Sequence, residues 1–153
     1  MVKIFFAIFL IGGLLQSAMA TGSESFLLGA VENLPTSLRI VKTCGNWQYG
    51  QQEGYYRLII GDVHNGAGSE VYVQFITNPD QNTASKLIKT LAFSELNNDH
   101  SQYYFQSIDC STVGKFTYVN VTGQYEHDEI PKMHHISIKL IDMNHYQLVE
   151  KKK

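Results

Sequence analysis

The sequence predicts a mainly β protein, an antiparallel β-sandwich or a partly open barrel of six to eight strands, with one helix near residues 83–94. Three observations lead to this expectation. Apolar and polar side chains alternate with a period of two in several segments, as half-buried strands require. Turn-forming residues separate these segments at short intervals. The connections are mostly too short for the crossovers that parallel strands need, so the strands are expected to be antiparallel.

The clearest strand covers residues 55–63, and residues 70–77 are expected to pair with it as a hairpin. Asn65-Gly66 lies between the two segments, and this dipeptide favours the positive φ angles of a tight turn. Apolar side chains occupy alternate positions in both segments, and these positions define the face that is expected to be buried. They are Tyr56, Leu58 and Ile60 in the first segment, and Val71, Val73 and Phe75 in the second.

Five further segments are expected to be strands. They cover residues 38–44, 101–110, 115–125, 134–142 and 146–149. A slip of one residue between neighbouring strands would place apolar side chains opposite polar ones. The residues that must share a face therefore limit two of these strands to registers that differ by an even number of residues. The residues that share a face are Val119 and Val121 on one strand and Ile136, Ile138 and Leu140 on the next.

The period of the pattern changes over residues 83–94, where a helix is expected. Apolar residues fall at positions i, i+3, i+4 and i+7, which is the stripe of an amphipathic helix. They are Ala84, Leu87, Ile88 and Leu91. Polar residues that can cap the first turn of such a helix precede it, namely Asp80, Asn82 and Thr83.

Residues 1–20 have the layout of a secretory signal peptide. Lys3 gives a positive start, residues 4–15 are apolar, and Ala18 and Ala20 form an A-x-A cleavage pattern. The apolar run is shorter than the about 20 residues that a membrane span needs. We therefore expect cleavage after Ala20, a single β-rich domain over residues 21–153 without stable membrane insertion, and a periplasmic or secreted location. The source, and so the choice between these two compartments, stays open.

The charge of the chain argues against nucleic acid as a partner. The formal net charge is −2, and removal of Lys3 with the signal peptide makes it more negative. A nucleic-acid-binding domain usually presents a basic face to the phosphates. The only basic run is at residues 151–153, where a solvated tail is the simpler interpretation.

The chain has two cysteines, Cys44 and Cys110. An even number of cysteines in an oxidising compartment favours a structural disulfide. Two free thiols or a redox pair are the alternatives. A thioredoxin-like role has no support because the sequence contains no C-x-x-C motif.

Histidines near the C-terminus are candidate ligands for copper or zinc, because imidazole binds both metals. The candidates are His127, His134, His135 and His145, with Met133 and Met143 nearby. Their spacing matches no zinc signature, and adjacent strand residues such as His134 and His135 point to opposite faces. The alternative is a polar hairpin tip with exposed histidines, in which case no cofactor is bound.

Gly45 and Trp47 form a G-x-W pattern directly after Cys44. This pattern resembles the G-x-W near the mature N-terminus of the lipocalins, which are exported barrels that carry small apolar ligands. The resemblance covers these two residues, and it implies an interior cavity for such a ligand. The alternative is a core tryptophan beside a structural cysteine.

Two tyrosine pairs, Tyr55-Tyr56 and Tyr103-Tyr104, lie on predicted strands. Alternation places one ring of each pair inward and one outward. If the two strands are neighbours, the outward rings form one aromatic patch for another protein or a cell-surface polymer. The alternative is that tyrosine simply suits half-buried strand positions.

The sequence contains no nucleophile elbow, P-loop, dinucleotide fingerprint or EF-hand loop, so no catalytic or cofactor-binding residue is assigned. A catalytic site assembled from distant residues stays open, as does the oligomeric state. Asn120-Val121-Thr122 is a glycosylation acceptor only in a eukaryotic protein with this site exposed. The expected function is an exported, non-catalytic binding or structural domain that uses an aromatic strand face. The alternatives are a metal-binding protein and a carrier of small apolar ligands.

Overall fold

The computed structural model describes residues 31–63, 66–97 and 103–151. The chain divides into two compact units, Met1–Leu34 and Pro35–Lys153, and all the strands of the described residues belong to the second. The predicted signal peptide lies outside the described residues. No helix in the described part is both long and apolar enough to cross a membrane.

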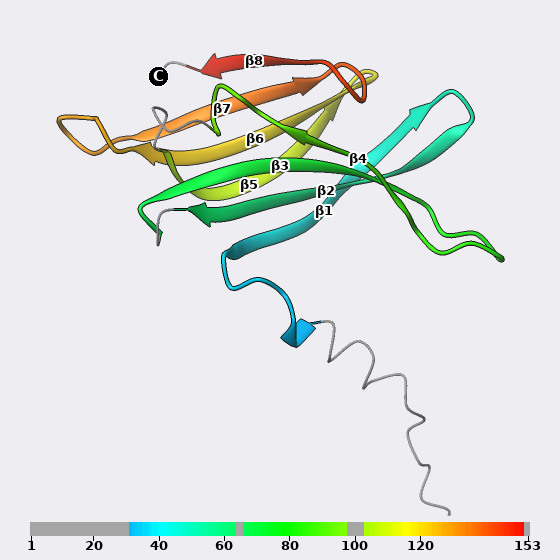
Figure 1. Ribbon diagram of the computed structural model, residues 1–153. Coiled ribbons are helices and arrows are strands. Elements are labelled where there is room, and N and C mark those ends of the chain that lie inside the picture. Colours follow the sequence, from blue (N-terminus) through cyan, green and yellow to red (C-terminus); the bar gives the residue numbers. More distant parts are fainter. Residues whose placement is uncertain (1–30, 64–65, 98–102, 152–153) are drawn as a thin grey trace, which may run out of the picture. The chain divides into compact units, whose positions relative to one another are not determined.

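In the part of the chain that the structure describes, eight antiparallel strands form two four-stranded sheets, and within each sheet every strand pairs with the next along the chain (Figure 1). The first sheet consists of β1 (Leu38–Tyr49), β2 (Gln52–Val63), β3 (Gly68–Thr77) and β4 (Leu87–Ala92). The second consists of β5 (Tyr103–Val113), β6 (Phe116–Tyr125), β7 (Met133–Leu140) and β8 (Tyr146–Lys151). The predicted β-sandwich is confirmed, and over the described strands it does not close into a barrel.

The alternation in the sequence sets the register of both sheets. Val119 pairs with Ile138 and Val121 with Ile136, and all four side chains are buried. The expected inward residues of β2 and β3 are also buried, since Leu58 lies opposite Val73. One cluster of buried side chains draws on both sheets, so the core lies between them.

The helix predicted over residues 83–94 is wrong, because this segment contains strand β4. Leu91 pairs with Val73 and is buried, whereas Leu87 is half exposed. Ile88 occupies an irregularity in the β3–β4 pairing, and this extra residue produces the helix-like spacing of apolar side chains. Pairing with β4 satisfies backbone groups along one edge of β3, which a helix would leave without partners.

Residues expected to cap that helix form a turn before β4 instead. Asp80 accepts a hydrogen bond at Oδ1 from the backbone N–H of Asn82, at 2.8 Å. The backbone N–H of Asp80 donates to the carbonyl of Thr83 at 3.0 Å. Such side-chain bonds stabilise turns as readily as helix starts, so they did not distinguish the two structures.

The disulfide Cys44–Cys110 joins edge strand β1 of the first sheet to edge strand β5 of the second. The two Cα atoms are 6.1 Å apart, within the usual range for a disulfide. The predicted disulfide is therefore confirmed, and it closes one side of the sandwich covalently.

Arg39 of β1 makes a second connection along this side. Its Nη2 donates to Ser69 Oγ at 2.9 Å and to the backbone carbonyl of Phe105. Its Nε lies 2.8 Å from Asp62 Oδ1, and its guanidinium lies 4.4 Å from the centre of the Tyr104 ring. One side chain thus links β1, β2, β3 and β5.

Near the other two edge strands, β4 and β8, the sheets meet through non-covalent contacts. The rings of Phe93, just after β4, and Tyr146, at the start of β8, pack edge to face with centres 4.9 Å apart. The Tyr146 hydroxyl donates to Glu95 Oε2 at 2.6 Å.

Candidate functional site

A bulge at Gly45 turns Trp47 toward the interior of the sandwich. Cys44 pairs with Tyr56 and Asn46 with Tyr55, so Gly45 is the extra residue in β1. Residues three apart on a regular strand face opposite sides, yet Cys44 and Trp47 are both buried in the core. Gly45 has φ of 45°, a left-handed conformation that favours glycine.

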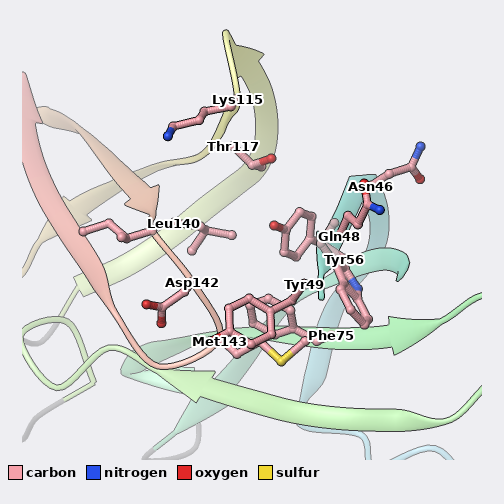
Figure 2. Close-up of a pocket in the computed structure, with 12 residues that line it drawn as sticks. Asn46, Gln48, Tyr49, Tyr56, Phe75, Lys115, Thr117, Leu140, Asp142 and Met143 are labelled. Atoms are coloured by element: carbon pink, nitrogen blue, oxygen red, sulfur yellow. The ribbon is translucent and has the colours of Figure 1, made fainter. Parts of the chain in front are cut away.

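Beside Trp47, the sandwich contains a cavity of about 310 Å³ between the two sheets (Figure 2). One wall comes from β1, β2 and β3, and the other from the start of β6 and the end of β7 with the turn that follows it. The lining residues are Asn46, Trp47, Gln48, Tyr49, Tyr56 and Phe75 on the first wall, and Lys115, Thr117, Leu140, Ile141, Asp142 and Met143 on the second.

Three aromatic rings form an inner surface of this cavity, which we call the aromatic floor: Trp47, Tyr56 and Phe75. Phe75 packs edge to face against both neighbours, with ring centres 5.7 Å from Trp47 and 5.1 Å from Tyr56. The indole N–H of Trp47 donates to the carbonyl of Tyr55 at 3.0 Å. Since that donor is engaged by the backbone, the indole offers the cavity its apolar carbon surface.

The Tyr56 hydroxyl reaches the opposite wall of the cavity. It hydrogen-bonds the side chain of Thr117 on β6, and burial raises the pKa of Tyr56 above its ordinary value of 10.0. The phenol is therefore neutral at physiological pH.

Two charged side chains line the cavity, and their surroundings differ. Asp142 Oδ1 accepts backbone N–H bonds from Asn144 at 2.7 Å and from His145 at 2.9 Å, and the His145 ring lies 2.8 Å from Oδ2. The Asn144 N–H, followed by His145, holds the pKa of Asp142 below its ordinary value of 3.8. Lys115 is exposed and makes no ion pair with any described residue; its Nζ lies 5.3 Å from the centre of the Phe116 ring.

The cavity thus combines the edges of three core aromatic rings with polar and charged side chains from both walls, and the polar groups make up the larger part of its exposed lining. Sequence analysis identified Trp47 through its G-x-W pattern. It missed Lys115, Asp142 and Tyr49 as site residues, because packing of the two sheets brings them together from distant parts of the chain. No local signal in the sequence links those parts.

The histidines near the C-terminus do not converge. His134 donates from Nε2 to Asp128 Oδ2 at 2.6 Å, and this bond is the main reason that the pKa of Asp128 lies below 3.8. The His134 ring also packs against Tyr103 and Tyr125, and His127 packs on Tyr125. His134 and His127 thus belong to an aromatic cluster at one end of the second sheet.

His135 and His145 lie elsewhere. His135 points to the other face of β7 and contacts Thr122 Oγ1 at 3.3 Å, while His145 lies in the turn after β7. Within the described ranges, no three histidine, cysteine or carboxylate side chains are placed to share one ion. Metal binding by His127, His134, His135 and His145 stays a prediction.

The two tyrosine pairs lie on different sheets, Tyr55-Tyr56 on β2 and Tyr103-Tyr104 on β5. Tyr56 and Tyr103 belong to or pack against the core, so Tyr55 and Tyr104 are the outward members. The strands are therefore not neighbours within one sheet, as a shared patch of outward rings would require.

Asn120 lies in the middle of β6 and hydrogen-bonds two neighbouring strands. Its Nδ2 donates to Ser111 Oγ at 3.3 Å, and its Oδ1 accepts from Ser137 Oγ at 2.9 Å. A glycan on Asn120 would have to replace these bonds.

Fold and cavity together define a two-sheet β-sandwich with an aromatic cavity between its sheets. Comparison of the sequence with protein-family models, and of the chain with curated proteins and solved structures, finds no match.

Proposed function

We propose that this protein is an exported, non-catalytic binding domain whose cavity holds a small ligand with a flat apolar ring. The observation that carries the proposal is the aromatic floor of Trp47, Tyr56 and Phe75 beneath a cavity of about 310 Å³. A cavity of this size lies at the lower end of the range that holds small molecules. The signal-peptide pattern and the disulfide support export.

The experiment uses Trp47, which is the only tryptophan of the chain and lines the cavity. Purified mature protein is titrated with 2-naphthylmethanol, and tryptophan fluorescence is recorded. We expect a saturable change, because a ring in the cavity would lie against the indole. The absence of a saturable change with this probe and with 2-naphthoate would contradict the proposal.

Tyr49→Ala tests whether the probe occupies this cavity, since Tyr49 lines it but is mostly exposed, so its loss spares the core. We expect weaker binding. The matched control is Tyr118→Ala, because Tyr118 is a tyrosine on the outer side of β6, next to buried Val119. Equal loss of affinity in both variants would mean that the probe binds elsewhere.

A second candidate is recognition of another protein or a cell-surface polymer on the outer face of the first sheet. Tyr55 pairs with Ile76 and Ile59 with Tyr72, and these side chains face away from the core. Ile59 and Ile76 are nevertheless buried, so the tyrosines and other neighbours cover them. Loss of retention on cell-surface material of the source in Tyr55→Ser, with unchanged naphthyl-probe binding, would support this function. Unchanged retention would exclude it.

A further inference from the structure

We infer that the cavity selects ligands in which the apolar ring carries an anionic group, such as an aromatic carboxylate, and that Lys115 supplies the opposing charge. This inference rests on the proposed function and deepens it by naming a ligand class.

The two charged side chains of the lining are not equally available to a ligand. The carboxylate of Asp142 already accepts two backbone N–H groups and lies against the His145 ring. These donors fix it within its own turn and offset part of its charge. The Lys115 ammonium has three N–H donors, and among the described residues it forms no ion pair and approaches only the Phe116 ring. A ligand anion is therefore the natural partner for Lys115.

Lys139 increases the positive potential near this position. Its Nζ lies 3.8 Å from the centre of the Phe116 ring, the same ring that Lys115 approaches. Lys139 makes no ion pair with a described carboxylate and is not part of the lining. Two ammonium groups close to one ring favour an anion over a neutral or cationic ligand within roughly a Debye length, about 8–10 Å in physiological salt.

The remaining lining explains why the ligand should also carry a ring. Figure 2 shows Lys115 and Thr117 on one wall and Tyr56 and Phe75 on the other, with the Lys115 side chain extending sideways rather than toward the two rings. A ligand ring placed against the aromatic floor can direct an attached carboxylate toward Lys115.

The test compares two probes that share a ring system, 2-naphthoate and neutral 2-naphthylmethanol, by Trp47 fluorescence. In the wild-type protein we expect about three- to tenfold tighter binding of 2-naphthoate, since one partly exposed ion pair contributes little more. This preference should weaken as salt is raised. Equal affinity for the two probes would overturn the inference but leave the proposed function intact. If neither probe binds, the proposed function fails as well.

Lys115→Gln and Lys139→Gln form a matched pair of variants, because both lysines contact Phe116 and only Lys115 lines the cavity. We expect Lys115→Gln to abolish the preference for 2-naphthoate, measured as the ratio of the affinities for the two probes. Lys139→Gln should keep most of the preference. A preference that survives Lys115→Gln, or that is lost equally in both variants, would contradict the role of Lys115.

Discussion

The side chain of Asn97 pairs with the backbone of Val71 as a neighbouring strand would. Its Nδ2 donates to the Val71 carbonyl and its Oδ1 accepts from the Val71 N–H, both at 2.8 Å. The β3–β4 pairing ends at Tyr72 and Ala92, so it stops one residue short of Val71. Asn97 therefore satisfies a backbone position at the edge of the sheet that β4 does not reach.

Replacing this carboxamide should destabilise the fold. In Asn97→Leu the Val71 N–H and carbonyl lose their partners, and we expect a loss of about 1–3 kcal/mol in the free energy of unfolding. Chemical denaturation measures this value. Asn82→Ala is the control, because the recorded hydrogen bond of Asn82 uses only its backbone. Equal stability of Asn97→Leu and wild type would show that water replaces the side chain without cost.

Substitution of three glycines by alanine should lower the stability of the fold to different extents. In Gly54→Ala the new Cβ would lie 1.8 Å from the carbonyl oxygen of Ile76, so the strands would have to move apart and the loss should be largest. Gly45→Ala must hold a left-handed conformation, which costs about 1–2 kcal/mol. At Gly61 the Cβ would make ordinary contacts from 3.7 Å, so Gly61→Ala should be close to neutral. Thermal denaturation gives the order, and a neutral Gly54→Ala would refute the close approach.

Removing the disulfide should destabilise the protein substantially. The bond closes a loop with a sequence separation of 66, for which loop entropy predicts about 4 kcal/mol, less any strain that is released. The double variant Cys44→Ala/Cys110→Ala is compared with wild type by denaturant unfolding. A reducing agent should lower the stability of wild type and leave the double variant unchanged. If the double variant is as stable as wild type, the covalent link contributes nothing to the fold.

Because of the pair of His134 and Asp128, the free energy of unfolding should depend on pH in the acidic range. The hydrogen bond from His134 lowers the pKa of Asp128 in the folded protein below 3.8. The folded state therefore binds this proton less readily than the unfolded chain. The pair stabilises the fold above the unfolded pKa, and that contribution is lost as pH falls through the lower folded pKa.

Asp128→Asn should accordingly be less stable than wild type near neutral pH, and the difference should shrink below about pH 4. Unfolding curves at a series of pH values measure this. The control is Glu126→Gln, an exposed residue of the same turn that makes no recorded ion pair. A difference between Asp128→Asn and wild type that stays constant with pH would mean that the carboxylate charge is not involved.

The sheets were predictable where side-chain alternation alone decides the structure. Val119 and Val121 pair with Ile138 and Ile136 as expected, because any slip by one residue would expose them. Strand β4 was not predictable in this way. Its spacing of apolar residues, distorted by the bulge at Ile88, matches a helix, and only its pairing with β3 shows that it is a strand.

The site was predictable only in part. Trp47 was identified, but the bulge at Gly45 that turns it inward is visible only once β1 and β2 are paired. Lys115 and Asp142 belong to turns at the ends of different strands, and their proximity to Trp47 results from packing of the two sheets. The tyrosine pairs illustrate the same limit, since a shared patch required neighbouring strands, whereas β2 and β5 belong to different sheets.

The covalent link between β1 and β5 also bears on how the chain folds. All pairing within each sheet joins consecutive strands, so both meanders can form from local hairpins early in folding. The two thiols meet only after the meanders have docked, because they lie on different sheets. The disulfide therefore secures the docked arrangement of the two meanders and not the strand pairing within either one.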